Sequence, residues 1–153
     1  MDLSHEIDLS LVLLGPAKTV VAACEHFSPL EIDTEDLAEI TIIHEGNRLS
    51  HLHLDYIQRS YSRSLKIIGL KGNIFWDYVN GYSEMILCGG ERERFDVPKD
   101  FNRDQMFRSQ MVHWLDVLDN GVSPKVSLRD GIAATRVALA ALESAEKRRY
   151  ILL

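Results

Sequence analysis

The sequence predicts an α+β protein, with a mostly antiparallel sheet of about six strands and helices packed on one face of the sheet. Three observations support this prediction. An apolar stripe at helical spacing opens the chain, alternating apolar segments fill its middle, and helical spacing returns after Pro98. The connections between the alternating segments are of hairpin length, which favours antiparallel pairing because parallel strands need long crossovers.

The chain opens with a predicted helix over residues 3–14, because its apolar residues recur at helical spacing. Gly15 ends this helix, since glycine readily takes the left-handed cap conformation, and Pro16 cannot continue it. The segments that follow alternate between apolar and polar residues, or are short apolar runs between turn residues, as strands do. Strands are expected over residues 17–26, 38–44, 48–57, 65–68, 73–79, 84–88 and 91–97.

Two helices are predicted after Pro98. Asn102 is expected to cap the first of them, and Asn120-Gly121 to end it. Its buried stripe is predicted to consist of Phe107, Met111, Trp114 and Leu118. Ser127 is expected to cap the last helix, with Asp130 placed where the helix dipole favours an acid. A row of small residues on this helix lets another backbone approach closely: Gly131, Ala134, Ala138, Ala141 and Ala145.

Length and composition indicate one globular domain over residues 1–153. Of these 153 residues, 46% are hydrophobic and 26% are charged, which excludes intrinsic disorder and low-complexity filaments. The formal net charge of -6 disfavours a general nucleic-acid or anionic-membrane surface.

No membrane or secretory segment is expected. The longest uncharged stretch, residues 9–17, is far shorter than the roughly 20 residues that span a bilayer. Acidic residues at the start of the chain do not fit a secretory signal. Cys24 and Cys88 have apolar neighbours and no CxxC spacing, so buried, reduced thiols and a cytoplasmic location are expected.

The densest set of ionisable residues lies at the start of the chain and contains Asp2 and His5. On a helix these residues are one turn apart, so the carboxylate can orient the imidazole, which can move a proton near neutral pH. The alternative is ordinary helix capping, with acidic residues compensating the helix dipole. Spacing alone favours this alternative.

His51, His53 and Asp55 share one face of a predicted strand and could ligate a metal. A polar sheet face is the favoured interpretation, because a catalytic metal usually takes three or more protein ligands with supporting residues around them. No metal is therefore expected.

The segment from Arg59 to Arg63 lies in a connection between strands, and functional residues concentrate in loops. Its two guanidinium groups and the Tyr61 phenol could bind a carboxylate, a phosphate or sugar hydroxyls. A solvated sheet edge explains the same residues equally well. Trp76-Asp77-Tyr78 is interpreted as packing rather than as a ligand site.

The sequence contains no glycine-rich phosphate cradle. Gly89-Gly90 precedes a predicted strand, whereas the dinucleotide fingerprint opens a helix. A P-loop, a nucleophile elbow and an HExxH motif are also absent from the sequence. No cofactor-binding residue is therefore expected in this chain.

Several segments, taken in order, resemble the C-terminal domain of the Gfo/Idh/MocA (glucose-fructose oxidoreductase / inositol dehydrogenase) family. They are the opening Asp2-Leu3-Ser4-His5-Glu6-Ile7-Asp8 helix ending at Leu14-Gly15, the pair Ile67-Ile68-Gly69-Leu70-Lys71-Gly72-Asn73-Ile74, Trp76-Asp77, and Val126-Ser127-Leu128-Arg129-Asp130-Gly131 with the alanine-rich helix that follows. The resemblance covers essentially the whole chain.

This resemblance implies part of an NAD(P)-dependent oxidoreductase that acts on a sugar or cyclitol. NAD or NADP would be bound mainly by an N-terminal Rossmann domain, which is absent from this chain. His5 would correspond to the histidine that transfers the substrate's proton, with Asp2 as its acidic companion. Asp2 stands three residues before His5, whereas the family's acid often stands four before. Tyr61 would contact the substrate, flanked by Arg59 and Arg63.

The resulting hypothesis is a substrate-binding and oligomerisation domain that is inactive as an isolated chain. A sugar-like substrate and a homodimer or higher homo-oligomer formed through the sheet face are the expected partners. The alternative is a stand-alone dimeric interaction module without catalysis.

Overall fold

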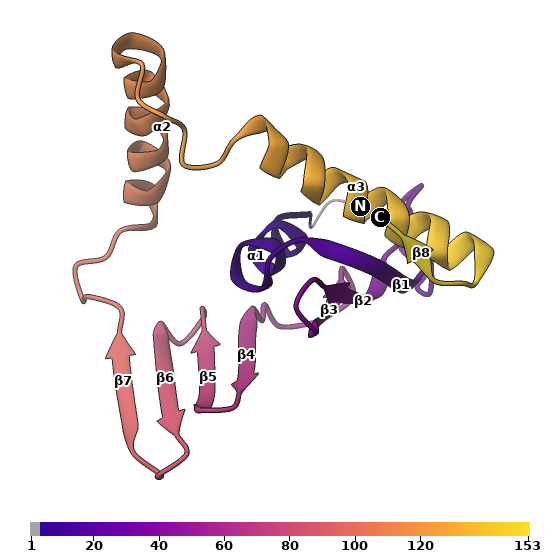
Figure 1. Cartoon of the computed structure of the whole chain (residues 1–153), viewed down its shortest axis with the longest axis horizontal. Helices are drawn as coiled ribbons and strands as arrows, with labels where there is room; N and C mark the ends of the chain where they lie inside the picture. The colour runs from indigo at the N-terminus through magenta and orange to yellow at the C-terminus, as the bar shows by residue number, and fades with distance from the viewer. Residues whose placement is uncertain (1–3) are drawn as a thin grey trace. The chain divides into compact units, whose positions relative to one another are not determined.

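The computed structural model describes residues 4–153, and these residues form two compact units (Figure 1). One unit holds residues 4–57 together with Lys125–Leu153, and it is called the helix-covered unit below. The other holds Gln58–Pro124 and is called the meander unit.

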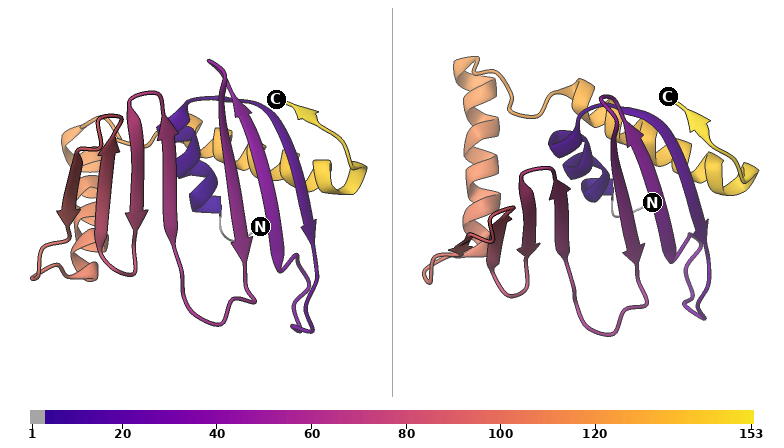
Figure 2. Two further views of the ribbon diagram at one scale, coloured as in Figure 1. Left: turned by 90° about the horizontal axis from the view of Figure 1, so that it is seen from below. Right: turned by 60° about the horizontal axis from the view of Figure 1, so that its bottom comes forward.

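The helix-covered unit is built on a four-stranded antiparallel sheet in the order β3-β2-β1-β8. Its strands are β1 (Ala17–Glu25), β2 (Leu37–His44), β3 (Arg48–Asp55) and β8 (Ile151–Leu152). Helices α1 (Ser4–Leu14) and α3 (Leu128–Lys147) cover one face of this sheet (Figure 2).

The core of this unit lies between the sheet and the two helices, because alternate strand residues point toward the helices. It consists of Ile7, Val20, Ala38, Ile40, Ile42, Leu54, Ala134, Val137, Ala140 and Ala141. Ala134 and Ala141 belong to the predicted row of small residues and are buried. Their small side chains let α3 lie close to β1, as the sequence predicts for such a row.

Ser144 fastens α3 to the edge of the sheet. Its buried hydroxyl oxygen accepts a hydrogen bond from the Ala22 amide at 3.0 Å, and its O–H donates to the Arg149 carbonyl at 2.6 Å. Arg148 ends α3 in the left-handed conformation, with φ 51°, and the chain then returns to pair β8 with β1. The sequence did not predict β8, because two residues are too few for an alternating pattern to show.

The meander unit contains a second four-stranded antiparallel sheet, in the order β4-β5-β6-β7, followed by helix α2. The elements are β4 (Ser64–Gly69), β5 (Gly72–Asp77), β6 (Tyr82–Leu87), β7 (Arg92–Asp96) and α2 (Arg103–Asn120). Gly72 has φ 157°, and a Cβ at this position would collide with the Ile86 carbonyl oxygen, so only glycine lets β5 approach β6 here.

The predicted fold class is confirmed. The described residues hold eight strands in two antiparallel sheets, and the predicted strands and helices are found within about two residues of their expected ends. The expected caps also form: Asn102 accepts from the Asp104 amide, Gly121 is left-handed, and Ser127 with Asp130 makes a capping box. No helix in residues 4–153 combines the length and apolar character that crossing a membrane requires.

The predicted burial of the α2 stripe is wrong. Phe107, Met111, Trp114 and Leu118 are each more than half exposed, and no residue of α2 is buried. An amphipathic pattern shows that a helix has a face suited to burial, but burial also needs a complementary surface. The described residues do not supply one.

We predict that Ser144→Ala destabilises the chain by about 1–3 kcal/mol, because it leaves the amide of Ala22 without its buried acceptor. Chemical denaturation followed by far-UV circular dichroism measures the loss. Ser109→Ala is the matched control, because Ser109 is exposed on α2. Equal unfolding free energies for the two variants would contradict the role given to Ser144.

Candidate functional site

His5 lies in the first turn of α1, and its side chain is 54% exposed. The Nε2 atom of His5 lies 3.2 Å from a carboxylate oxygen of Glu6. Asp2, the predicted acidic companion, lies outside the described residues. The structure therefore places an accessible imidazole beside a carboxylate, an arrangement suited to general acid–base chemistry.

A buried polar cluster fixes α1 against the sheet, and sequence reasoning missed it. Ser10 on α1 meets Ser50 on β3 at 3.0 Å between their hydroxyl oxygens. His44 on β2 joins them: its Nε2 lies 2.8 Å from the Ser50 hydroxyl, and its Nδ1 donates to the Gly15 carbonyl at 2.7 Å. The detectable signal is that His44 continues the inward-facing positions of an otherwise apolar strand.

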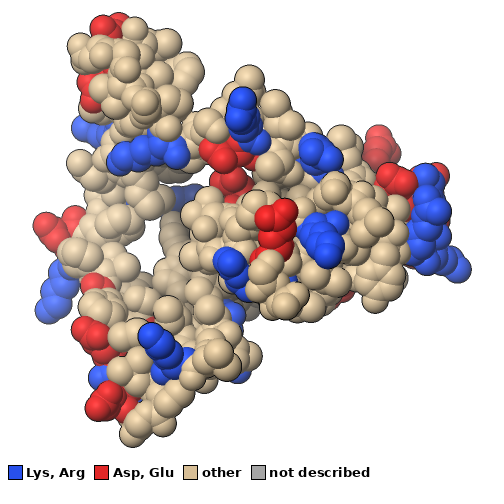
Figure 3. All heavy atoms as spheres, in the orientation of Figure 1, with Lys and Arg blue, Asp and Glu red and all other residues tan. Residues whose placement is uncertain are grey.

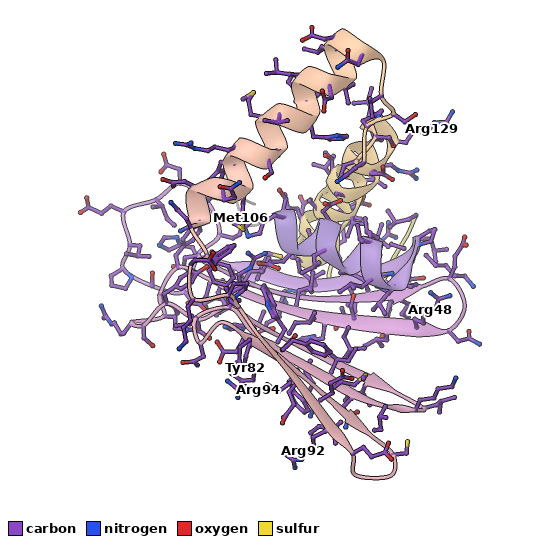
Figure 4. All side chains as sticks on the ribbon, turned by 90° about the vertical axis from the view of Figure 1, so that its left-hand side faces the viewer. Arg48, Tyr82, Arg92, Arg94, Met106 and Arg129 are labelled. Atoms are coloured by element: carbon purple, nitrogen blue, oxygen red, sulfur yellow. The ribbon has the colours of Figure 1, made fainter. Side chains whose placement is uncertain are left out.

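Arg48 fixes the other end of α1. Its guanidinium donates to the Leu14 carbonyl at 3.1 Å, and the side chain lies beside the C-terminal end of the helix (Figure 4). A cation is favoured here, because the last carbonyls of a helix carry partial negative charge. Together with the buried cluster, Arg48 gives the helix that carries His5 a defined position within its unit.

His51, His53 and Asp55 form a polar network with Glu39 on the face of β2 and β3 that the helices leave open. Glu39 connects the two histidines, at 3.0 Å from His51 Nε2 and 2.5 Å from His53 Nδ1. The other ring nitrogen of His53 lies 2.9 Å from Asp55, and that of His51 lies 3.0 Å from the Thr41 hydroxyl.

This network differs from a metal-ligand set. Both ring nitrogens of His53 face carboxylates, which can only accept, so the arrangement favours the protonated ring. The hydrogen bond to Glu39 is the main reason that the pKa of His53 is raised. A metal needs a lone pair on the ring instead. Within residues 4–153, no three His, Cys, Asp or Glu side chains are grouped so that they could hold a metal ion.

In the meander unit, Tyr61 and Arg63 meet on the ring of Tyr78. The ring centroids of Tyr61 and Tyr78 are 6.3 Å apart, nearly perpendicular, and the guanidinium carbon of Arg63 lies 5.6 Å from the Tyr78 centroid. The same guanidinium carbon is 5.3 Å from the centroid of Trp76. Arg59, the third predicted substrate contact, is exposed in the same connection.

The β4–β5 hairpin brings these residues together. Leu65 pairs with Trp76 in the register, and the amide of Tyr78 donates to the Arg63 carbonyl at 3.0 Å. Trp76 lies on β5 and Tyr78 directly follows the last residue of that strand, and their ring centroids are 5.8 Å apart. Trp76 and Tyr78 were predicted to be packing residues, and in the structure they pack with Tyr61 and Arg63 in one cluster.

Charges elsewhere on the protein are mixed in sign. Lys and Arg side chains alternate with Asp and Glu side chains over the face shown in Figure 3. On β6 and β7, Arg94 lies over the Tyr82 ring at 4.0 Å and 2.9 Å from Asp96, and Figure 4 shows Tyr82 and Arg94 side by side. This pattern does not mark a polyanion-binding surface.

The family described as "Oxidoreductase family, C-terminal alpha/beta domain" matches residues 1–153. The chain belongs to the Gfo/Idh/MocA oxidoreductase family. No curated protein sequence matches this Gfo/Idh/MocA domain.

Solved structures show the same fold. Levoglucosan dehydrogenase in complex with NADH and levoglucosan has a TM-score of 0.87 and 16% identity, covering 99% of this chain and 49% of that one. An oxidoreductase from Agrobacterium radiobacter, in complex with NAD+, L-tartaric acid and magnesium, has a TM-score of 0.83 and 23% identity, covering 99% and 48%. An oxidoreductase domain protein from Kribbella flavida has a TM-score of 0.83 and 18% identity, with the same coverage. The chain spans about half the length of these proteins.

The Gly89-Gly90 turn does not have the geometry of a dinucleotide phosphate cradle. Gly89 and Gly90 form the turn from β6 to β7, and the Gly90 amide donates to the Leu87 carbonyl at 2.9 Å. A strand follows this turn, whereas a phosphate cradle needs the free amides of a helix N-terminus.

We predict that His53→Gln lowers the melting temperature at about pH 6 but has little effect at about pH 9. The pKa of His53 is raised in the folded chain. Its contribution to stability is therefore fully present below the unfolded pKa and is lost as the pH rises through the folded pKa. Thermal unfolding of wild type and variant across this pH range measures the difference. A difference that stays constant with pH would contradict the assignment.

Proposed function

We propose that this chain is the substrate-binding and oligomerisation domain of an NAD(P)-dependent oxidoreductase that acts on a sugar or cyclitol hydroxyl. As an isolated chain it is inactive. One observation carries this proposal: the exposed imidazole of His5 lies beside a carboxylate, on a helix fixed by a buried polar cluster, in a chain of an oxidoreductase family.

His5 accepts the proton of the substrate hydroxyl. A nicotinamide held by the other domain would supply the hydride acceptor for the C–H bond at the same carbon, so that the C–O bond would become a carbonyl. The proton remains on the imidazole and is then released to solvent. Asp2 is the proposed acidic companion that stabilises the imidazolium.

Tyr61, Arg59 and Arg63 contact the substrate in this proposal. A phenol and two guanidinium groups supply donors that suit hydroxyl and carboxylate oxygens. Two solved relatives support a polyhydroxylated substrate, since one contains levoglucosan and another contains L-tartaric acid.

The cofactor, NAD or NADP, is held by a separate dinucleotide-binding domain, and residues 1–153 act as one C-terminal domain beside it. Two relatives contain NADH or NAD+, and this chain covers about half of each of them. A cytoplasmic location is part of the proposal. Cys24 and Cys88 are free thiols; Cys24 is half-buried, whereas Cys88 is exposed and its predicted burial is wrong. Burial is the main cause that raises the pKa of Cys24 to about 11, so the Cys24 thiol is unreactive.

Homo-oligomers form through the sheet face of the helix-covered unit that the helices leave open. Ile43 is 36% exposed on this face, and by strand alternation Thr41 and His51 lie on the same face. Sheet faces that mix apolar and polar residues in this way suit a symmetric contact, in which each copy presents the same patch.

We predict that Ile43→Lys converts the oligomer to a monomer without loss of secondary structure, because it places like charges opposite each other across a symmetric contact. Sedimentation velocity measures the change, and Lys18→Gln, at an exposed position of β1, is the control. A wild-type chain that stays monomeric well above micromolar concentration would rule out the sheet-face oligomer.

The open sheet face also favours a second candidate function, a stand-alone dimeric module without catalysis. In that case the face is an association surface, and His5 has no chemical role. The two candidates differ in whether a protein that carries this chain oxidises a sugar with NAD(P), and in whether His5 contributes to that activity.

We predict that His5→Gln lowers kcat of the complete oxidoreductase by about 10²- to 10⁴-fold with little change in KM, because glutamine cannot accept the hydroxyl proton. Steady-state kinetics with the sugar substrate and the nicotinamide cofactor measure the loss. The control is His26→Gln, since His26 is an exposed histidine in the β1–β2 connection. Unchanged kcat in His5→Gln would contradict the proposed role of His5, whereas a wild-type protein that oxidises no sugar would favour the module without catalysis.

A further inference from the structure

We propose that the apolar stripe of α2 pairs antiparallel with the same stripe of a second copy of this chain. The stripe consists of Phe107, Met111, Trp114 and Leu118. This inference rests on the proposed oligomerisation and goes beyond it, because it adds a second self-association surface to the sheet face. Two different symmetric contacts make a tetramer, in which α2 joins two sheet-face dimers.

The stripe has the composition of a protein interface. Its four side chains are between 53% and 61% exposed, and helical spacing places them on one face of α2. Aromatic residues and methionine are enriched at protein interfaces, and tryptophan is among the residues whose removal costs most binding energy. Contiguous exposed apolar surface marks a site of interaction, whereas scattered exposed apolar residues do not.

The order of residues in the stripe suits a partner identical to itself. In an antiparallel pair centred between Met111 and Trp114, Met111 of each copy faces Trp114 of the other. Phe107 then faces Leu118, because Phe107 stands four residues before Met111 and Leu118 stands four residues after Trp114. Each aromatic ring therefore meets an aliphatic or thioether side chain, and contacts of sulfur with aromatic rings are favourable.

The charges of α2 also favour an antiparallel partner. Residues 103–111 hold two basic residues and one acidic residue, whereas residues 112–120 hold two acidic residues and no Lys or Arg. Acidic residues near the C-terminal end of a helix are unfavourable, because the last carbonyls carry partial negative charge. The last turn of α2 has no basic residue that would offset them. An antiparallel partner brings its positive half beside these acidic residues.

One specific ion pair follows from this arrangement. Arg108 and Asp119 are both exposed, and within residues 4–153 no hydrogen bond or ion pair involves either side chain. They stand about three full turns apart, so they lie on the same flank of the stripe. Equal flanks meet in a symmetric antiparallel pair, so Arg108 of each copy lies beside Asp119 of the other, displaced by about 3 Å along the helix. Asp104 lies on this flank too, and the positive end of its own helix stabilises its charge.

A single α2 pair is small. Each copy contributes the four residues of the stripe together with Leu115, Arg108 and Asp119, whereas a stable interface uses roughly 20–30 residues on each side. One pair is therefore too weak to hold two separate chains together at micromolar concentration. Two pairs in a tetramer act together, because the sheet-face contact has already joined the chains that carry them. Loss of the sheet-face contact consequently still gives a monomer.

Sedimentation velocity of the 153-residue chain tests the inference. We expect a tetramer for the wild type, and Trp114→Lys halves it to a dimer without changing the circular dichroism spectrum. Val112→Lys is the matched control and leaves the tetramer intact. Val112 is 59% exposed on the same helix, but it lies about 130° around the helix axis from the centre of the stripe.

Charge reversal tests the antiparallel direction. Arg108→Asp or Asp119→Arg alone places like charges beside each other across the contact, so each single variant is expected to give dimers. The double variant that carries both changes restores opposite charges and recovers the tetramer. A parallel pair would show no such rescue, because its positions 108 and 119 lie about 16 Å apart along the helix. Both residues are exposed, so these variants test the contact even if Trp114→Lys fails to fold.

Two results overturn the inference and leave the proposed sheet-face contact standing. The first is a wild-type dimer that Ile43→Lys dissociates and Trp114→Lys leaves intact, because α2 then meets another domain or another protein. The second is a tetramer that survives Trp114→Lys, because the stripe is then not the second contact. A wild-type chain that stays monomeric overturns the inference and the proposed sheet-face oligomer together.

Discussion

The close packing of α3 on β1 is the constraint on which the helix-covered unit depends. Ala134 and Ala141 have so little side-chain volume that the helix lies directly over the strand, and larger residues would force the two apart. Ser144 continues this contact at the sheet edge, where it replaces a strand partner for β1. Because α1 contacts both α3 and β3, the position of α3 also determines where α1 can lie.

Hydrophobic packing alone would hold α1 against the sheet, but it would not define where along the sheet the helix lies. The cluster of Ser10, His44 and Ser50 supplies that definition, because buried hydrogen bonds have one arrangement that satisfies them all. Arg48 adds a bond at the end of the helix. His5 is proposed to move a proton, so a fixed support matters for it. Small displacements of a catalytic group lower the reaction rate strongly.

Most of the secondary structure could be predicted from sequence because its determinants are local. The box of Ser127 and Asp130 and the cap at Asn102 depend on residues a few positions apart. Features that depend on contacts between distant segments could not be predicted in this way. The sequence does not show whether the apolar stripe of α2 has a partner, and the partners of His44 lie on other segments of the chain. The place of Trp76 beside Arg63 depends on the hairpin register.

The proposed division of labour assigns the substrate to this chain and the dinucleotide to another domain. Two features of the described residues support the assignment of the substrate to this chain: an exposed imidazole and an arginine packed on aromatic rings. Within the described residues, no helix N-terminus follows a glycine-rich phosphate cradle, which supports the assignment of the dinucleotide to another domain. Titration of NADH with the 153-residue chain, followed by cofactor fluorescence, tests this division most directly. We expect no saturable binding, and stoichiometric binding at micromolar concentration would contradict the division.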